Sequence, residues 1–268
     1  MKFSVSQRIS AALVVLALAT LACNFGKPPP AAPQETDLPP TQITQATQPA
    51  NNDQGLCSNP LYPVKIGATW TYTSTGSLTS DHSFTDTITD VRDDGFTLTS
   101  QFDQLTRTQE WACKPEGLTS LTFGGGAAAG ISTSGVQMDL TTSNVQGVSL
   151  PKTINVGDQW PYSLDFKGTM ELNGTSVEAQ GTATYAFNAL GEESVTVPAG
   201  TFNAMKIHAE VVLDIQVTFS GINTPVQFTS SSDMWFAPDV GWVKSTGSGD
   251  IMGTSYDESI ELQSYNIP

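Results

Sequence analysis

The sequence has little charge, and very little of that charge is positive. Only 14% of its 268 residues are charged, and 11 Lys plus Arg stand against 26 Asp plus Glu, for a net charge of −15. An acidic chain repels phosphate backbones, so we expect no nucleic-acid partner. Lys, Arg and Glu, which favour helices, are scarce, whereas Ser, Thr and Gly are plentiful. This composition favours β structure outside the cytoplasm.

Cysteine and histidine are also scarce, with three Cys and two His in the whole chain. A zinc site needs three or four ligands, and His82 and His208 lie in different halves of the sequence, so we predict no metal site and no cofactor. Cys57 and Cys113 are too far apart for a Cys-x-x-Cys redox motif. In an oxidising compartment such a pair predicts a disulfide rather than a metal or redox site.

Only one long apolar run occurs, and it lies at the N-terminus. Lys2 and Arg8 precede and flank it, and Ile9 to Leu21 has the length of a signal-peptide core, so residues 1–22 are predicted to be a signal peptide. The segment Leu18 to Cys23, LATLAC, resembles the lipobox of bacterial lipoproteins, with Thr20 where that family usually has Leu. The resemblance implies that Cys23 carries a lipid that anchors the protein to a bacterial membrane, at the cell surface or facing the periplasm. The alternative is cleavage near Ala19 or Ala22 and secretion.

A segment rich in Pro, Gln, Thr and Ala follows the lipobox. Residues 23–55 contain almost nothing that could be buried, which predicts a disordered tether. The folded part then covers residues 56–268. Beyond the signal peptide no apolar period of 3.6 residues occurs, so the predicted fold is all-β with few or no helices.

Strict alternation between apolar and polar residues marks the strongest strand, Met205 to Phe219. All its odd positions are apolar, and all its even positions except Val212 are polar. Strands usually have about 5–6 residues, so one this long is expected to bend. We predict a strongly curved antiparallel sheet, a half-barrel or an open barrel or sandwich, with a dry inner face that could hold a hydrophobic ligand: Met205, Ile207, Val211, Leu213, Ile215, Val217, Met234 and Phe236.

The folded part contains a weak internal repeat. Ile66-Gly67-x-x-Trp70-x-Tyr72 returns as Val156-Gly157-x-x-Trp160-x-Tyr162, which predicts two related halves, about 56–150 and 151–268. Turn residues at Asp93-Asp94-Gly95 and Pro198-Ala199-Gly200 separate the alternating segments. The first half is expected to have short strands over 69–74, 83–91, 96–102, 106–113 and 118–123. In the second half, Glu193–Val197 is expected to be a brief strand of its own.

Two segments of the folded part resemble a family of bacterial envelope lipoproteins. Tyr62 to Tyr72 is similar to the opening of the folded domain in lipoproteins labelled TapB-like, and Val195 to Phe202 followed by Trp235 to Lys244 is similar to a recurring pattern in them. The resemblance implies a long curved sheet, remotely similar to the half-barrel of the lipoprotein carriers LolA and LolB. Those carriers hold acyl chains on a greasy concave face, but their plugging helices have no counterpart in this sequence. The TapB-like group has no established activity to transfer.

No arrangement of residues predicts catalysis. Ser149-x-x-Lys152 has the spacing of an acyl-enzyme motif, but Pro151 lies inside it and no helix begins there. We therefore expect a tethered binding or scaffold module rather than an enzyme, with a hydrophobic ligand or an envelope protein as partner. The alternatives are a structural or protein-contact module with a filled core, a hydrolase, or a carbohydrate-binding module that stacks sugars on its tryptophans: Trp70, Trp111, Trp160, Trp235 and Trp242.

Overall fold

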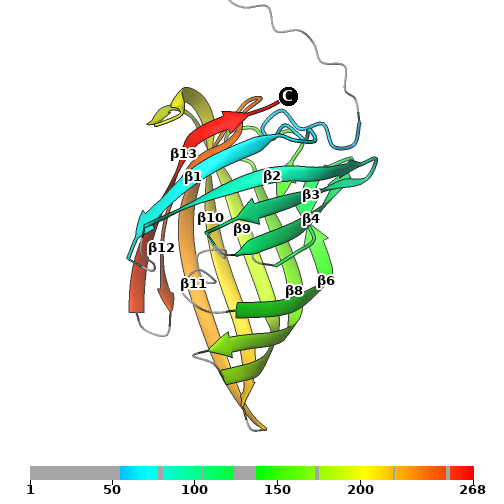
Figure 1. The fold of residues 1–268 in the computed structure, drawn as a ribbon, viewed down its shortest axis with the longest axis vertical. Helices are drawn as coiled ribbons and strands as arrows, with labels where there is room; N and C mark the ends of the chain where they lie inside the picture. The colour runs from blue at the N-terminus through cyan, green and yellow to red at the C-terminus, as the bar shows by residue number, and fades with distance from the viewer. Residues whose placement is uncertain are drawn as a thin grey trace, which may run out of the picture. The chain divides into compact units, whose positions relative to one another are not determined.

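The computed structural model describes residues 55–77, 81–103, 105–123, 137–172, 175–219, 221–251 and 254–268. Over these ranges the chain is all-β without helices, and its strands form one 13-stranded antiparallel sheet that curls into a half-barrel (Figure 1). The predicted fold class is confirmed. No helix in these ranges is long and apolar enough to cross a bilayer. The predicted signal peptide, the predicted lipidation site Cys23 and nearly all of the predicted tether lie outside the described residues.

The first half of the sequence forms short strands. The five predicted segments agree with the first five strands to within a few residues, whereas the strands at 137–147 and 150–151 were not predicted. The strands are β1 (Thr69–Gly76), β2 (His82–Arg92), β3 (Gly95–Gln101), β4 (Thr106–Lys114), β5 (Gly117–Ser120), β6 (Gln137–Gly147) and β7 (Leu150–Pro151).

The second half forms much longer strands. They are β8 (Gln159–Leu172), β9 (Thr175–Val197), β10 (Gly200–Phe219), β11 (Ile222–Ala237), β12 (Gly241–Ile251) and β13 (Thr254–Asn266). The prediction of a separate brief strand at Glu193–Val197 is wrong, because this segment is the end of the 23-residue β9. Lys206 of β10 pairs with Gly191 and Ile207 pairs with Ala189, so Leu190 is the extra residue of a β-bulge that lets β9 continue.

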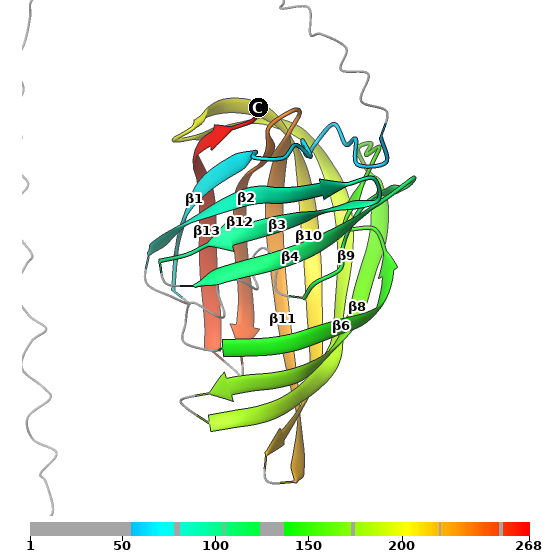
Figure 2. The same ribbon diagram turned by 45° about the vertical axis from the view of Figure 1, so that its right-hand side comes forward.

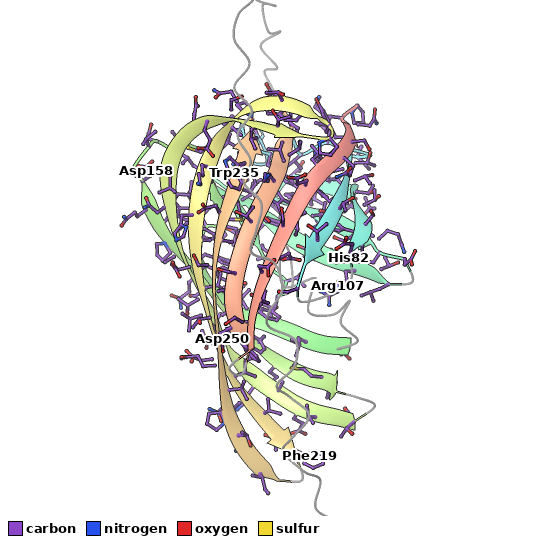
Figure 3. The ribbon with its side chains drawn as sticks, turned by 90° about the vertical axis from the view of Figure 1, so that its left-hand side faces the viewer. His82, Arg107, Asp158, Phe219, Trp235 and Asp250 are labelled. Atoms are coloured by element: carbon purple, nitrogen blue, oxygen red, sulfur yellow. A yellow bond between two sulfur atoms is a disulfide. The ribbon has the colours of Figure 1, made fainter. Side chains whose placement is uncertain are left out.

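The alternation of Met205 to Phe219 corresponds to two faces of β10. Met205, Ile207, Ala209, Leu213 and Ile215 are buried. Glu210, Asp214 and Gln216 on the other face are exposed. The alternation ends at the tip of the β10–β11 hairpin, where Phe219 is 55% exposed (Figure 3).

The sequence repeat corresponds to a repeated turn. The N–H of Gly67 donates to the Ile88 carbonyl at 2.8 Å, and the N–H of Gly157 donates to the Ala189 carbonyl at 2.7 Å. Both glycines have positive φ, 78° and 90°, which a side chain would disfavour. The residue after each accepting carbonyl, Thr89 or Leu190, is the extra residue of a β-bulge. The two halves therefore begin with the same turn, clamped to the same place on the following hairpin.

The halves close on one another rather than forming separate sheets. The last strand of the second half, β13, pairs with β1, and β6 at the end of the first half pairs with β8. The two edges of the sheet, β6 and β7, are joined by only Val148 and Ser149, and the Ser149 N–H donates to the Leu118 carbonyl of β5 at 3.0 Å. Strands β2–β4 thus cross steeply over the long strands β9–β12, with the interior between these two layers (Figure 2).

A disulfide fixes the segment that precedes β1. Cys57 and Cys113 are bonded, with an S–S distance of 2.04 Å and a Cα–Cα distance of 4.8 Å. The bond ties the beginning of the described chain to the end of β4, as the sequence predicted. Beside it, Tyr62 stacks on Trp70 and Trp111 at centroid distances of 5.4 and 6.3 Å, so an aromatic cluster closes this end of the interior.

Candidate ligand cavity

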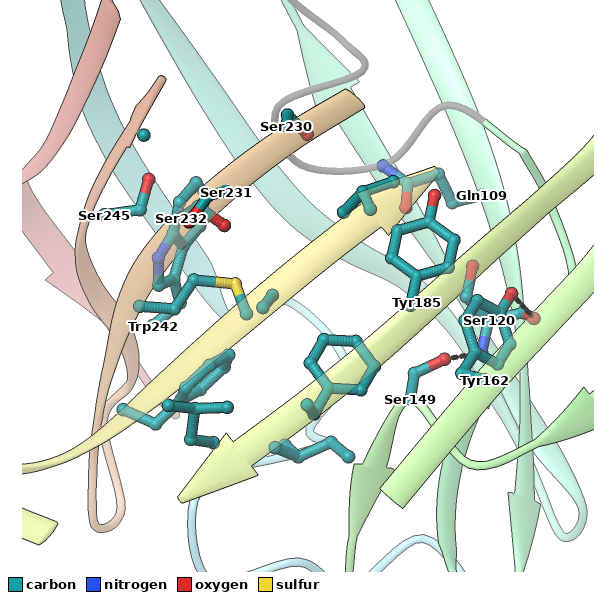
Figure 4. A pocket seen from close by; sticks show the side chains of 18 of the residues that line it. Gln109, Ser120, Ser149, Tyr162, Tyr185, Ser230, Ser231, Ser232, Trp242 and Ser245 are labelled. Atoms are coloured by element: carbon teal, nitrogen blue, oxygen red, sulfur yellow. Dashed lines mark hydrogen bonds between the residues drawn. The ribbon is translucent and has the colours of Figure 1, made fainter. Parts of the chain in front are cut away.

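A cavity of about 270 Å³ lies between the two layers of the curled sheet (Figure 4). Residues of β1–β5 and β7–β13 line it, so it belongs to the interior of the half-barrel and not to one loop. Its volume lies just below the range of about 300–1,000 Å³ that is typical of small-molecule sites. The inner surfaces of the sheet are therefore not wholly filled by the side chains of the described residues.

The predicted apolar face contributes part of this lining. Ile207, Val211 and Leu213 of β10 line the cavity, and Met234 and Phe236 of β11 lie next to them. The other three predicted residues are elsewhere in the apolar interior. Met205 and Ile215 are buried in the core and Val217 packs against it, but none of them lines the cavity: the strand runs past the cavity at both ends.

Polar residues occupy the inward positions on the neighbouring strands. Residues directly opposite one another in antiparallel strands share a face, and Ala209 of β10 is opposite Ser232 of β11, which is opposite Gly247 of β12. Gly247 is in turn opposite Glu258 of β13. The inward face therefore changes from apolar to polar between β10 and β13.

The adjacent row across these strands has the same character. Val211 is opposite Ser230, Ser230 is opposite Gly249, and Gly249 is opposite Tyr256. A Cβ on Gly249 would lie 2.7 Å from the Tyr256 hydroxyl oxygen, so glycine is what allows the Tyr256 ring to lie across this strand. We call Ser230, Ser232, Ser245, Tyr256 and Glu258 the polar wall; all five line the cavity.

The polar wall was not predicted from the sequence. Ser230 and Ser232 interrupt an otherwise apolar series at Phe228, Met234 and Phe236, and this interruption was the signal that could have identified it. A Ser in an alternating strand is ordinary, however. Only the register of four strands shows that these residues are neighbours.

Among the residues that the structure describes, two carboxyl groups line the cavity, Asp86 on β2 and Glu258 on the polar wall. Asp86 is only 8% exposed and accepts a hydrogen bond of 2.5 Å from the Ser100 hydroxyl. Burial raises the pKa of Asp86 to about 6, and the hydrogen bond from Ser100 only partly opposes that shift. Burial likewise raises the pKa of Glu258, and the hydrogen bond that it accepts from Ser74 at 3.0 Å opposes the rise.

On the wall opposite β11–β13, polar groups are hydrogen-bonded to one another. The Tyr162 hydroxyl donates to the Ser120 carbonyl at 2.7 Å, and the Ser120 N–H donates to the Ser149 hydroxyl at 3.0 Å (Figure 4). Burial raises the pKa of Tyr162 and of Tyr185 beside it, so both phenols stay neutral near pH 7. Ser149, which the sequence placed in an acyl-enzyme spacing, is thus a structural acceptor here.

The five tryptophans divide between core and cavity. Trp70 and Trp235 are 1% and 7% exposed, and their indole N–H groups donate to the Val240 carbonyl and to Glu193. The other three tryptophans contribute aromatic rings to the lining of the cavity: Trp111, Trp160 and Trp242.

A group that resembles a catalytic triad lies on the outer face of the sheet. His208 Nδ1 is 2.7 Å from Asp233 Oδ1, and His208 Nε2 is 3.5 Å from Ser231 Oγ. The same Nε2 is only 2.9 Å from Glu210 Oε1, however. Both ring nitrogens thus face carboxylates, which raise the pKa of His208 and favour the imidazolium. An imidazolium cannot accept the proton of a serine, so this group does not have the chemistry of a nucleophile and its base. Among the described residues no three metal-binding side chains form a cluster.

Comparison with known proteins identifies a family and several solved structures of low similarity. A family model described as DUF3108-like matches residues 128–267. An exported protein with a YmcC-like fold from Bacteroides fragilis is 12% identical, with a TM-score of 0.47, over 77% of this chain and 98% of that one. A lipoprotein from Parabacteroides distasonis is 15% identical, with a TM-score of 0.43, over 78% and 99%. The hypothetical lipoprotein YmcC from Escherichia coli is 9% identical, with a TM-score of 0.33, over 76% and 86%. No curated protein matches the chain. The TapB-like and LolA/LolB names are not among these matches, and those resemblances stay predictions.

Proposed function

This chain belongs to the DUF3108-like family, and from its sequence and its cavity we propose that it is an extracytoplasmic lipoprotein whose β domain binds a hydrophobic or amphiphilic ligand inside the half-barrel. The lipobox-like segment at Cys23 and the low charge of the chain support the location. The tether predicted for residues 23–55 would keep the domain near the membrane, where such a ligand occurs.

The cavity is the observation that carries the binding function. A module that served only as a scaffold would be expected to fill its interior, because empty apolar space costs stability. Here Ile207, Val211 and Leu213 are inward-facing and yet border a space of about 270 Å³. A bound apolar group would restore the contacts that the empty space lacks.

Val211 and Val212 provide a matched pair for testing the proposal. Val211 lines the cavity, whereas Val212, its neighbour on the opposite face, does not; both side chains are partly buried. Val211→Trp would place an indole in the cavity, and Val212→Trp would place the same group outside. The mature protein is titrated with the apolar dye N-phenyl-1-naphthylamine, and its fluorescence is measured.

We expect saturable fluorescence enhancement with the wild type and with Val212→Trp, and loss of it with Val211→Trp. Circular dichroism and the melting temperature establish that both variants are folded. If the wild type bound no dye and extracted no lipid from vesicles, the proposal would be rejected. Equal dye binding by two folded variants would place the dye elsewhere and remove the support that the cavity gives.

A further inference from the structure

The charge of the cavity lining has one sign. Asp86 and Glu258 line the cavity, and no Lys, Arg or His is among the described residues that do so. Three of the chain's basic side chains form ion pairs on the outer face instead: Lys206 with Asp233 at 2.9 Å, Lys244 with Glu261 at 2.7 Å, and Arg92 with Glu110 at 2.6 Å. Resting on the ligand-binding function proposed above, we infer that the ligand is an amphiphile with an ammonium head group and that the cavity rejects anionic amphiphiles such as fatty-acid carboxylates.

The polar wall can receive such a head group. Hydroxyl oxygens accept hydrogen bonds from an ammonium, and Ser230 and Ser232 are aligned with Tyr256 and Glu258 on the inward rows of β11 and β13. The Glu258 carboxylate would supply the opposite charge, through a charge-assisted hydrogen bond of the stronger kind. Aromatic rings add favourable contacts with a cation, and Trp242 also lines this part of the cavity.

The rest of the ligand would lie on the apolar side. Ala209 and Val211 are directly opposite Ser232 and Ser230, so apolar and polar lining meet along the boundary between β10 and β11. A hydrocarbon chain on β10 would therefore have its polar end at the polar wall. This alignment distinguishes an amphiphile from a wholly apolar ligand.

An anionic head group would meet unfavourable charge at the same place. It would lie close to a carboxylate and would lose its water without gaining a cation in exchange, which is costly in a buried site. The net charge of −15 adds a long-range repulsion for anions and attraction for cations. Two basic side chains come close to the lining without being part of it. One is His82, whose charge opposes the rise in the pKa of Glu258. The other is Arg107 on β4. It is opposite Ser100 and so has the same inward register as Gln109, but it does not line the cavity.

Three twelve-carbon amphiphiles with different head groups test the inference. Dodecylamine, dodecanol and dodecanoate are each used below their micelle concentration, near neutral pH, to displace N-phenyl-1-naphthylamine from the mature protein. We expect dodecylamine to bind on the order of tenfold more tightly than dodecanoate, because one charge-assisted hydrogen bond contributes about that factor. Glu258→Gln should abolish most of this preference.

Asp257→Asn is the matched control, since Asp257 is the exposed neighbour of Glu258 on the same strand. It removes the same charge from the protein, so it should leave the preference unchanged. Asp86→Asn provides a second lining variant in case Glu258→Gln does not fold.

The outcomes separate the inference from the proposed function. Failure of the dye and of all three amphiphiles to bind would reject both. Dye binding together with dodecanoate binding as tight as that of dodecylamine would reject the ammonium ligand but keep the binding function. A preference for dodecylamine that persisted in both Glu258→Gln and Asp86→Asn would also overturn the inference, because surface charge would then explain it.

Discussion

Replacing Asp86 with Asn should stabilise the domain above pH 7, although Asp86 is one of its most buried polar residues. The Asp86 carboxyl is 8% exposed, with Tyr62 and Tyr72 near it, and burial raises its pKa from an ordinary 3.8 to about 6. A carboxyl whose pKa is raised by folding binds a proton more readily in the folded chain than in the unfolded chain. Its ionisation therefore opposes folding.

The size of the effect follows from the shift. Each pKa unit corresponds to about 1.36 kcal/mol, so a shift of about two units corresponds to about 3 kcal/mol. At pH 3 and below the carboxyl is almost wholly protonated in both states, so the penalty nearly disappears. Stability falls as the pH rises from about 4 to about 6, and the full penalty applies above pH 7. The neutral amide of the Asp86→Asn variant would avoid this penalty and could still accept the hydrogen bond that Ser100 donates.

Urea unfolding of the ligand-free protein between pH 4 and pH 8 measures this difference. We expect Asp86→Asn to raise the free energy of unfolding by about 2–3 kcal/mol at pH 8 and by less than about 1 kcal/mol at pH 4, at an unchanged m-value. Ser100→Ala should have the opposite sign and lower stability more at pH 8 than at pH 4, because the ionised carboxylate loses its donor. Asp257→Asn, at an exposed position, should follow the wild-type profile. An Asp86→Asn variant no more stable than the wild type at pH 8 would show that the buried carboxylate does not destabilise the fold.

Three further predictions concern the disulfide, the surface histidine and the anchor. Replacing both Cys57 and Cys113 with Ser should lower the free energy of unfolding by about 4 kcal/mol, since the disulfide closes a loop with a sequence separation of 56. An equal melting temperature for the oxidised and the reduced wild type would contradict this. His208→Gln should lower the free energy of unfolding by about 0.5 kcal/mol at pH 6 and leave it unchanged at pH 9. Asp233 and Glu210 raise the pKa of His208, and the stabilisation that they give the imidazolium is lost as the pH rises through that pKa. A loss of stability that grows with pH would show that packing, not charge, is responsible. Mass spectrometry of the N-terminal peptide from membrane fractions should find a diacylated Cys23, and an unmodified thiol there would exclude the anchor.

Local patterns predicted most of the strands because their causes are local. The period of two over Met205 to Phe219 follows from one dry and one wet face, and the turn at Asp93-Asp94-Gly95 follows from the conformations that those residues allow. The repeated glycines Gly67 and Gly157 also mark real equivalent turns. Each of these features depends on residues close together in the sequence.

The remaining features depend on pairing between distant segments. Strand β6 was missed because its apolar residues are few and irregular, and it is held by pairing with β8 rather than by a strong pattern of its own. The continuity of β9 depends on a bulge at Leu190. Residues 190–194 have no buried side chain, and the buried alternation resumes only at Val195 and Val197, so the sequence suggests two strands. The polar wall needs the register of β10 to β13, which no single segment contains.

Asp86 and Glu258 also bear on how stability and binding are related in this fold. A cavity in the core and an ionised carboxyl beside it both lower stability, by mechanisms that replacement with Asn, Gln or a larger apolar residue would remove. Single substitutions could make such replacements. The presence of residues that destabilise the empty domain is therefore better explained by ligand binding than by the stability of the ligand-free domain. An ammonium amphiphile would fill the space and neutralise the charge of Glu258 at the same time. The two costs would then be relieved by one ligand. That joint relief favours an amphiphile over a purely apolar molecule, which would fill the space but bring no positive charge to Glu258, whose carboxyl group accepts a hydrogen bond from Ser74.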